Sequence, residues 1–143
     1  TEISGYGFSV STVKHAHHTF DVDQEGKDSY RHRIAGAREV LLASRNRFAL
    51  MHEMRADDEP TLNELLGKLA PVDLVLIEGY KRDGNSKIEA FRAQTNNPLI
   101  ATGDLTIRAV ASNTPMPLDR PVFDLDDTVA VADFILSEVG LIK

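Results

Sequence analysis

Short runs rich in β-branched and other apolar residues alternate along the chain with stretches in which apolar residues recur every three or four positions. The first pattern predicts strands and the second predicts amphipathic helices. The predicted strands cover residues 9–15, 47–54, 72–77, 87–92, 99–102, 107–112 and 121–123. The predicted helices cover residues 28–44, 61–69 and 126–140, and residues 1–7 resemble a helix end. Because strands and helices alternate, we expect an α/β fold with a largely parallel sheet.

Local signals support several of these elements. Thr61 and Glu64 have the spacing of a capping box, which predicts a helix start. Asp28 or Ser29 is the expected cap of the longest predicted helix. The run over residues 72–77 is almost continuously apolar, as in a strand that is covered on both faces.

Composition and charge limit the class of protein. The chain has 143 residues, so we expect residues 1–143 to form a single domain. A net charge of −6 gives no overall basic field, so we expect neither nucleic acid nor a membrane as a partner. No apolar run approaches the roughly 20 residues that span a bilayer. The chain has no cysteine, which excludes disulfides and thiolate sites and fits a cytoplasmic protein.

The densest polar group is Lys14-His15-Ala16-His17-His18, at the carboxyl end of the first predicted strand. Ligands of open α/β sheets bind beyond such ends. The three imidazoles and the ammonium group can hold phosphate oxygens, the imidazoles alone can hold a metal ion, and a plain surface turn is a third possibility. Histidine pairs at strand ends also occur in metal-dependent amidohydrolases, but their barrel needs about 250 residues.

A second basic segment runs from Gly26 to Arg33, at the start of the longest predicted helix. Backbone N–H groups and the helix dipole attract anions to such a start, and Lys27, Arg31 and Arg33 add positive charge. An ordinary solvated helix start would have the same composition. Only a short loop separates this segment from the histidines, which favours an anion site.

Glu78 follows the most apolar predicted strand. A carboxylate at the end of a buried strand is costly unless it is solvated or paired. Phosphate-binding α/β proteins use such a group to hold Mg²⁺, directly or through water. Gly79 would let the chain turn close to a ligand, and Lys81 adds a cation. The alternative is a structural ion pair between Glu78 and a neighbouring Arg or Lys.

Two further features carry weaker signals. Asn113 follows a predicted strand, and its amide has both a donor and an acceptor for the edge of a purine base. Asp124, Asp126 and Asp127 resemble a metal cluster, but we interpret them as the cap and the favourable charge of the last helix.

A phosphate loop of the form G-x-x-x-x-G-K-[ST] does not occur in these 143 residues. The two Gly-Lys pairs, at Gly26 and Gly67, are followed by Asp28 and Leu69 in place of Ser or Thr. Neither pair has glycine at the required earlier position.

Five segments together resemble the molybdopterin-guanine dinucleotide biosynthesis adapter (MobB) family, in the order and at about the spacing of that family. They are Val13–His18, Gly26–Arg33, Ala35–Ala37, Asp73–Lys81 and Lys87–Glu89. The combination is more specific than any one segment and extends over essentially the whole chain. The resemblance implies a P-loop NTPase-like fold with a mostly parallel sheet flanked by helices, here without the first strand and the phosphate loop.

The resemblance also implies a function. Proteins of this family bind GTP, are typically dimeric and assist a molybdopterin guanylyltransferase, the partner enzyme that joins GMP to molybdopterin. The chain is therefore expected to be a GTP-binding adapter with at most slow GTP hydrolysis, to use GTP and Mg²⁺, and to form a homodimer. In this interpretation Glu78 assists Mg²⁺, His15, His17, Lys27, Arg31 and Lys81 face a phosphate of GTP or of the pterin, Gly79 permits close approach, and Asn113 lies near the base.

Two other functions remain open at this point. The first is a nucleotide-independent module that binds only the partner or the pterin. The second is metal-dependent hydrolysis at the histidine cluster, which predicts stoichiometric zinc in the purified protein. The leading hypothesis predicts that the gene encodes a phosphate loop about 20 residues upstream of Thr1, the spacing expected in strand–loop–helix units.

Overall fold

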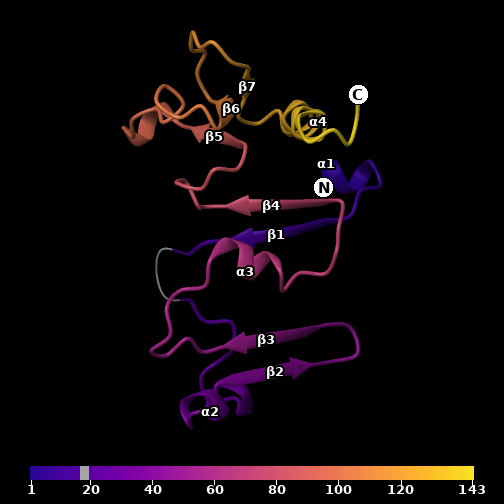
Figure 1. The fold of residues 1–143 in the computed structure, drawn as a ribbon, viewed down its shortest axis with the longest axis vertical. Helices are drawn as coiled ribbons and strands as arrows, with labels where there is room; N and C mark the ends of the chain where they lie inside the picture. Colours follow the sequence, from indigo (N-terminus) through magenta and orange to yellow (C-terminus); the bar gives the residue numbers. More distant parts are fainter. Residues whose placement is uncertain (17–19) are drawn as a thin grey trace. The chain divides into compact units, whose positions relative to one another are not determined.

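The computed structural model describes residues 1–16 and 20–143. They form two compact units, one made of Thr1–Val13 with Pro71–Lys143 and the other of Lys14–Ala70. Figure 1 traces the chain through both units. The single domain expected for residues 1–143 stays a prediction. No helix in this part of the chain is long and apolar enough to cross a membrane.

The first unit contains most of the parallel strands. Its elements are α1 (Glu2–Gly5), β1 (Val10–Lys14, except for its last residue), β4 (Leu74–Glu78), β5 (Lys87–Phe91), the short 3₁₀ helix η1 (Ala93–Thr95), β6 (Ile107–Ser112), β7 (Val122–Asp124) and α4 (Thr128–Glu138). β1 pairs with β4 in one sheet, and Figure 1 shows their arrows pointing the same way. β5, β6 and β7 form a second sheet in which both pairings are parallel. The α/β class with parallel strands is therefore confirmed.

Helix α4 supplies much of the apolar core of this unit. Its Ala132 and Leu136 are buried together with Ile3 of α1. Partly buried residues from the start of the chain through β1, from β4, from α4 itself and from the chain end pack against them, namely Phe8, Val10, Leu74, Leu76, Ile135, Leu141 and Ile142. On the same helix, the ring of Phe134 lies 5.3 Å from that of Phe123 in β7. The helix thus packs against both sheets of the first unit.

The second unit is built around a β-hairpin. Its elements are α2 (Asp28–Ile34), β2 (Glu39–Ala43), β3 (Phe48–His52) and α3 (Leu62–Leu66). β2 and β3 are antiparallel, with Leu41 opposite Leu50 and Ala43 opposite Phe48. The hairpin turn closes where the Ser44 N–H donates to the Arg47 carbonyl at 2.8 Å.

The helix predicted over residues 28–44 is wrong beyond its first half. α2 ends at Ile34, and Gly36 takes a φ of 111°, which a right-handed helix does not contain. The chain then enters β2, where Leu41 faces Leu50 of β3. Leu41 lies four positions after Ala37, a spacing that fits both the period of a helix and the alternation of a strand. The segment forms a strand because it pairs with β3. The cap of α2 is Lys27, one residue before the expected Asp28.

The strand predicted over residues 99–102 is also wrong, since this segment is a turn. The side chain of Glu89 in β5 accepts hydrogen bonds from the backbone N–H groups of Ile100 and Ala101, at 2.9 and 2.7 Å. A carboxylate therefore satisfies the donors that a neighbouring strand would otherwise need to satisfy.

Candidate functional site

The carboxyl end of β4 carries the predicted metal-binding carboxylate. Glu78 is the last residue of the strand, and it is exposed. Gly79 and Tyr80 follow with φ values of 97° and 47°, so two successive residues are left-handed. Tyr80 is unusual in this conformation because it has a side chain. The chain therefore turns sharply after Glu78, and Lys81 is exposed.

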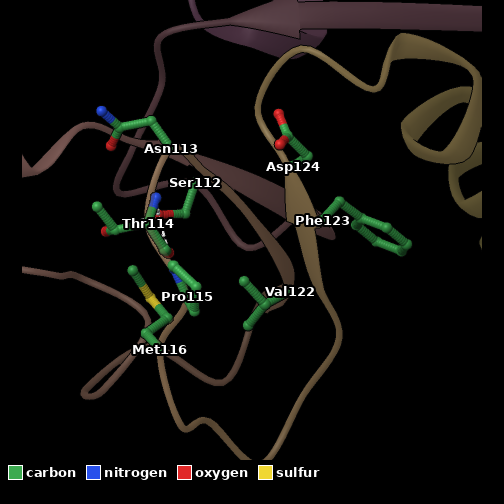
Figure 2. A pocket seen from close by; sticks show the side chains of 8 residues that line it. All are labelled: Ser112, Asn113, Thr114, Pro115, Met116, Val122, Phe123 and Asp124. Carbon is green, nitrogen blue, oxygen red and sulfur yellow. Dashed lines mark hydrogen bonds between the residues drawn. The ribbon is translucent and has the colours of Figure 1, made fainter.

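A pocket lies where β6 and β7 end. Its volume is about 300 Å³, and Figure 2 shows the side chains that line it. They are Ser112, Asn113, Thr114, Pro115, Met116, Val122, Phe123 and Asp124. Because β6 and β7 are parallel neighbours, their carboxyl ends form one edge, the edge at which open α/β sheets bind ligands. In Figure 2, Asn113 and Asp124 are drawn at one end of the pocket and Met116 toward the other.

Asn113 lines the pocket, and its side chain also forms hydrogen bonds within the chain. Its side-chain oxygen accepts a hydrogen bond from the Ala93 N–H at 3.2 Å, and its amide nitrogen donates to the side-chain oxygen of Gln94 at 2.7 Å. An asparagine amide has two N–H donors, so one donor is left after these contacts. The two bonds fix the orientation of the amide.

Asp124 lines the pocket, a role that was not predicted from the sequence. Of the three aspartates expected to supply the cap and the favourable charge of the last helix, Asp127 is the cap, and its carboxylate accepts the Ala130 N–H at 3.0 Å. Asp124 ends β7, and one of its oxygens accepts the Asp126 N–H at 2.9 Å. Its signal in the sequence was the same as that of Glu78, a carboxylate directly after an apolar strand.

The second unit holds the remaining predicted site residues. His15 follows β1, and its Nε2 atom lies 2.8 Å from the carboxylate of Glu59 in the loop before α3. Sequence reasoning missed Glu59, which is distant in the chain. His17 lies outside the residues that the structure describes.

Lys27 and Arg31 are both exposed at the start of α2. Arg31 lies 3.8 Å from Asp28, one turn away on the same helix. Asp28 is in the first turn, so its negative charge offsets part of the positive field that an anion would meet. The two cations lie on the surface of the unit and are not buried in it.

Arg33, which the sequence grouped with these cations, has a different role. Its guanidinium group lies 2.7 Å from Asp21 and 2.9 Å from Asp23, and Glu53 is 3.8 Å away. The Asp23 side chain is only 1% exposed. The hydrogen bond to Asp23 raises the pKa of Arg33 above its ordinary value. This network ties the loop before α2 to the helix, so the expectation that Arg33 binds an anion is corrected.

The number of protein side chains needed to bind a metal ion differs between metals. Within residues 1–16 and 20–143, no three His, Asp or Glu side chains gather as a cluster that could hold a metal ion. A site for Mg²⁺ needs less, because this ion commonly takes one or two protein carboxylates together with phosphate oxygens and water. Glu78, exposed at a strand end, fits that requirement.

Comparison with known proteins identifies relatives along most of the chain. The family model for MobB, molybdopterin guanine dinucleotide synthesis protein B, matches residues 1–113. The molybdopterin-guanine dinucleotide biosynthesis adapter protein of Escherichia coli is 38% identical over 133 residues, which are 91% of this chain and 76% of that protein. The protein of the same name from Haemophilus influenzae is 38% identical over 129 residues, 88% of this chain and 70% of that protein.

Solved structures agree with this result. The crystal structure of a molybdopterin-guanine biosynthesis protein B superposes with a TM-score of 0.73 at 22% identity, covering 95% of this chain and 84% of that one. The structure of a MobB homologue from Bacillus stearothermophilus gives 0.68 at 26% identity, covering 97% and 83%. The P-loop NTPase-like α/β fold is thereby confirmed. By its motifs, its relatives and its fold, the chain belongs to the MobB family of molybdopterin guanine dinucleotide synthesis proteins.

Proposed function

We propose that the protein acts as a GTP-binding adapter that assists the attachment of GMP to molybdopterin. Its part in molybdopterin guanine dinucleotide biosynthesis follows from membership of the family. The finer proposal, GTP binding, rests mainly on one observation. The pocket at the carboxyl ends of β6 and β7 combines apolar walls with polar side chains, and this is the edge where nucleotides bind in such folds.

Glu78 supports the phosphate part of the proposal. An exposed carboxylate at the end of β4 would bind Mg²⁺ directly or through water. The bound ion would neutralise charge on the phosphates. Lys81, three residues later and exposed, would attract the same anionic group. Gly79 lets the backbone turn here without a side chain between the chain and a ligand.

The second unit offers its own cations. We assign His15, Lys27 and Arg31, with His17 as the sequence predicts, to binding a phosphate group of GTP or of the pterin. Glu59 would hold the ring of His15 through its 2.8 Å contact with Nε2. Such a carboxylate partner orients an imidazole toward its ligand.

The partners follow from the same function. The two curated relatives are named adapter proteins, which suits a role beside a molybdopterin guanylyltransferase. A homodimer is supported by the apolar outer face of the β2–β3 hairpin, where Leu41, Phe48 and Leu50 are exposed. A cytoplasmic location fits the chain without cysteine.

Isothermal titration calorimetry of the full-length protein with GTP and Mg²⁺ tests the nucleotide proposal. We expect saturable binding that Glu78→Gln weakens at least about tenfold when Mg²⁺ is present, the scale typical of lost metal-site contacts. Asp58→Asn, which changes an exposed carboxylate in the loop before α3, should leave binding unchanged. Full-length protein that binds no GTP would leave the nucleotide-independent module as the better description.

A further inference from the structure

We propose that Lys87 is a positioning residue, which keeps the loop between β4 and β5 folded so that Lys81 is held at the carboxyl end of β4. The inference rests on the proposed nucleotide binding, in which Lys81 attracts a phosphate group, and it adds the residue that fixes this cation in place. Lys87 begins one of the five segments that resemble the MobB family, and it does not line the pocket at β6 and β7.

The ammonium group of Lys87 is occupied by the protein itself. It donates to the main-chain carbonyl of Asp83, to that of Asn85 at 3.2 Å and to the Thr106 hydroxyl at 2.6 Å. An ammonium group has three N–H donors, so these acceptors use all of them. The side chain is only 18% exposed, and the Asp104 carboxylate lies 3.9 Å from its nitrogen. Lys87 therefore acts on the loop and is not itself placed to bind a phosphate group.

Two of the three acceptors belong to the loop that carries Lys81. The Asp83 N–H donates to the Tyr80 carbonyl at 3.0 Å, which closes a turn with Lys81 as its second residue. The Asp83 carboxylate also accepts from the side-chain amide of Asn85 at 2.7 Å. Because Lys87 holds the carbonyls of Asp83 and Asn85, it fixes the part of the loop that follows Lys81.

The beginning of the same loop needs such support. Tyr80 has a φ of 47°, which is rare for a residue with a side chain, and Gly79 before it is the most flexible type of residue. A residue keeps a sparsely populated conformation only where the surrounding structure fixes it. Without the contacts of Lys87, we expect Tyr80 to relax to a common conformation. Lys81 would then move away from the end of β4.

Arg120 provides a matched control from the same unit. It is also a largely buried cation, 13% exposed, that donates to main-chain carbonyls. Its acceptors are Asp104 at 3.1 Å and Ile107 at 2.6 Å, just before β6 and at its first residue. Replacing Arg120 removes a cation of similar burial and leaves the three acceptors of Lys87 in place.

Isothermal titration calorimetry of the full-length protein with GTP and Mg²⁺ tests the inference. Lys81→Met should weaken binding at least about tenfold, and Lys87→Met should weaken it by a similar factor. The double variant should bind no more weakly than Lys81→Met alone, because Lys87 acts through Lys81. Arg120→Met should bind GTP as the wild type does.

Hydrogen exchange of the ligand-free protein, followed by mass spectrometry, is a second readout. Lys87→Met should speed exchange over residues 80–86 and leave α4 unchanged, whereas Arg120→Met should leave residues 80–86 unchanged. Faster exchange throughout the unit in Lys87→Met would mean a general structural role and would overturn the inference.

The inference and the proposed function fail in different ways. If Lys87→Met binds GTP as tightly as the wild type, or if the two losses multiply in the double variant, Lys87 does not position Lys81 while nucleotide binding stands. A wild type that binds no GTP would overturn the proposed nucleotide binding and this inference together.

Discussion

At the scale of single residues, Ser9 and Asp73 join the beginnings of β1 and β4. The Asp73 carboxylate accepts hydrogen bonds from the Ser9 hydroxyl at 2.6 Å and from the Ser9 N–H at 2.7 Å. The Asp73 N–H donates in return to the Ser9 hydroxyl oxygen at 3.0 Å. These bonds favour the ionised carboxylate, so they lower the pKa of Asp73 below its ordinary value.

The lowered pKa predicts a loss of stability in acid. In the unfolded chain Asp73 titrates near its ordinary pKa of about 3.9, above its folded value. Its contribution is therefore complete above that pH and disappears as the pH falls through the folded pKa. Asp73→Asn should lower the free energy of unfolding at pH 7, and its difference from the wild type should shrink below about pH 4.

Urea unfolding at a series of pH values measures this effect, with Asp58→Asn as the control for removing an exposed carboxylate. A difference between wild type and Asp73→Asn that stays constant from pH 7 to pH 3 would contradict the assignment. Other carboxylates have lowered pKa values for similar reasons, so the variant removes only part of the acid sensitivity. They are Glu39, Glu64, Asp104 and Asp119.

Residues of the candidate site could be predicted where the signal lies in adjacent positions of the sequence. Glu78 and Gly79 lie where a strand end and a turn were expected. The place of Asp124 in the pocket wall was not predictable, because a carboxylate near the start of a helix fits a pocket wall as well as the favourable charge of that helix. Arg33 was misassigned because its partners Asp21 and Asp23 come from a loop whose path the sequence does not specify.

At the scale of elements, α4 connects most of the first unit. Leu136 is fully buried and lies in one cluster with Ile3 of α1 and with partly buried residues of β1 and β4. Leu136→Ala should lower the free energy of unfolding by about 2–5 kcal/mol, the range for deleting a buried leucine side chain. Val129→Ala, on the same helix but half exposed, should cost less than about 1 kcal/mol.

Denaturant unfolding of both variants shows whether α4 contributes to stability through packing of its buried side chains or through the helix-forming tendency of its residues. Equal costs for the two substitutions would mean that α4 is stabilised by its own helical residues and not by packing. Circular dichroism at 222 nm follows the transition and shows whether each variant starts from a folded state.

Element types were predictable where the evidence is short-range. α3 begins with the capping box that the sequence indicated, Thr61 accepting from the Glu64 N–H and Glu64 accepting from the Thr61 N–H. β2 was not predictable in this way, because its identity depends on pairing with β3. The turn over residues 99–102 depends likewise on Glu89, ten or more positions earlier. Such tertiary contacts override a local pattern.

At the scale of the whole molecule, the β2–β3 hairpin has one face that the unit itself leaves apolar. Leu41, Phe48 and Leu50 lie on that face by register, and they are 63%, 75% and 54% exposed. On the opposite face Val40 is buried, whereas Leu42 is 53% exposed. Adjacent exposed apolar side chains of this size are typical of protein interfaces, and the proposed homodimer would cover them.

Light scattering coupled to gel filtration tests whether this face is the dimer contact. The wild type should have the mass of two chains, and the double variant Phe48→Glu with Leu50→Glu should have the mass of one, because burying two carboxylates in an apolar interface is unfavourable. Leu105→Glu places one carboxylate at an exposed leucine of the other unit and should leave the dimer intact. A wild type of single-chain mass would contradict the homodimer. A double variant that stays dimeric would place the contact elsewhere, so the hairpin face would need a different partner, such as the guanylyltransferase.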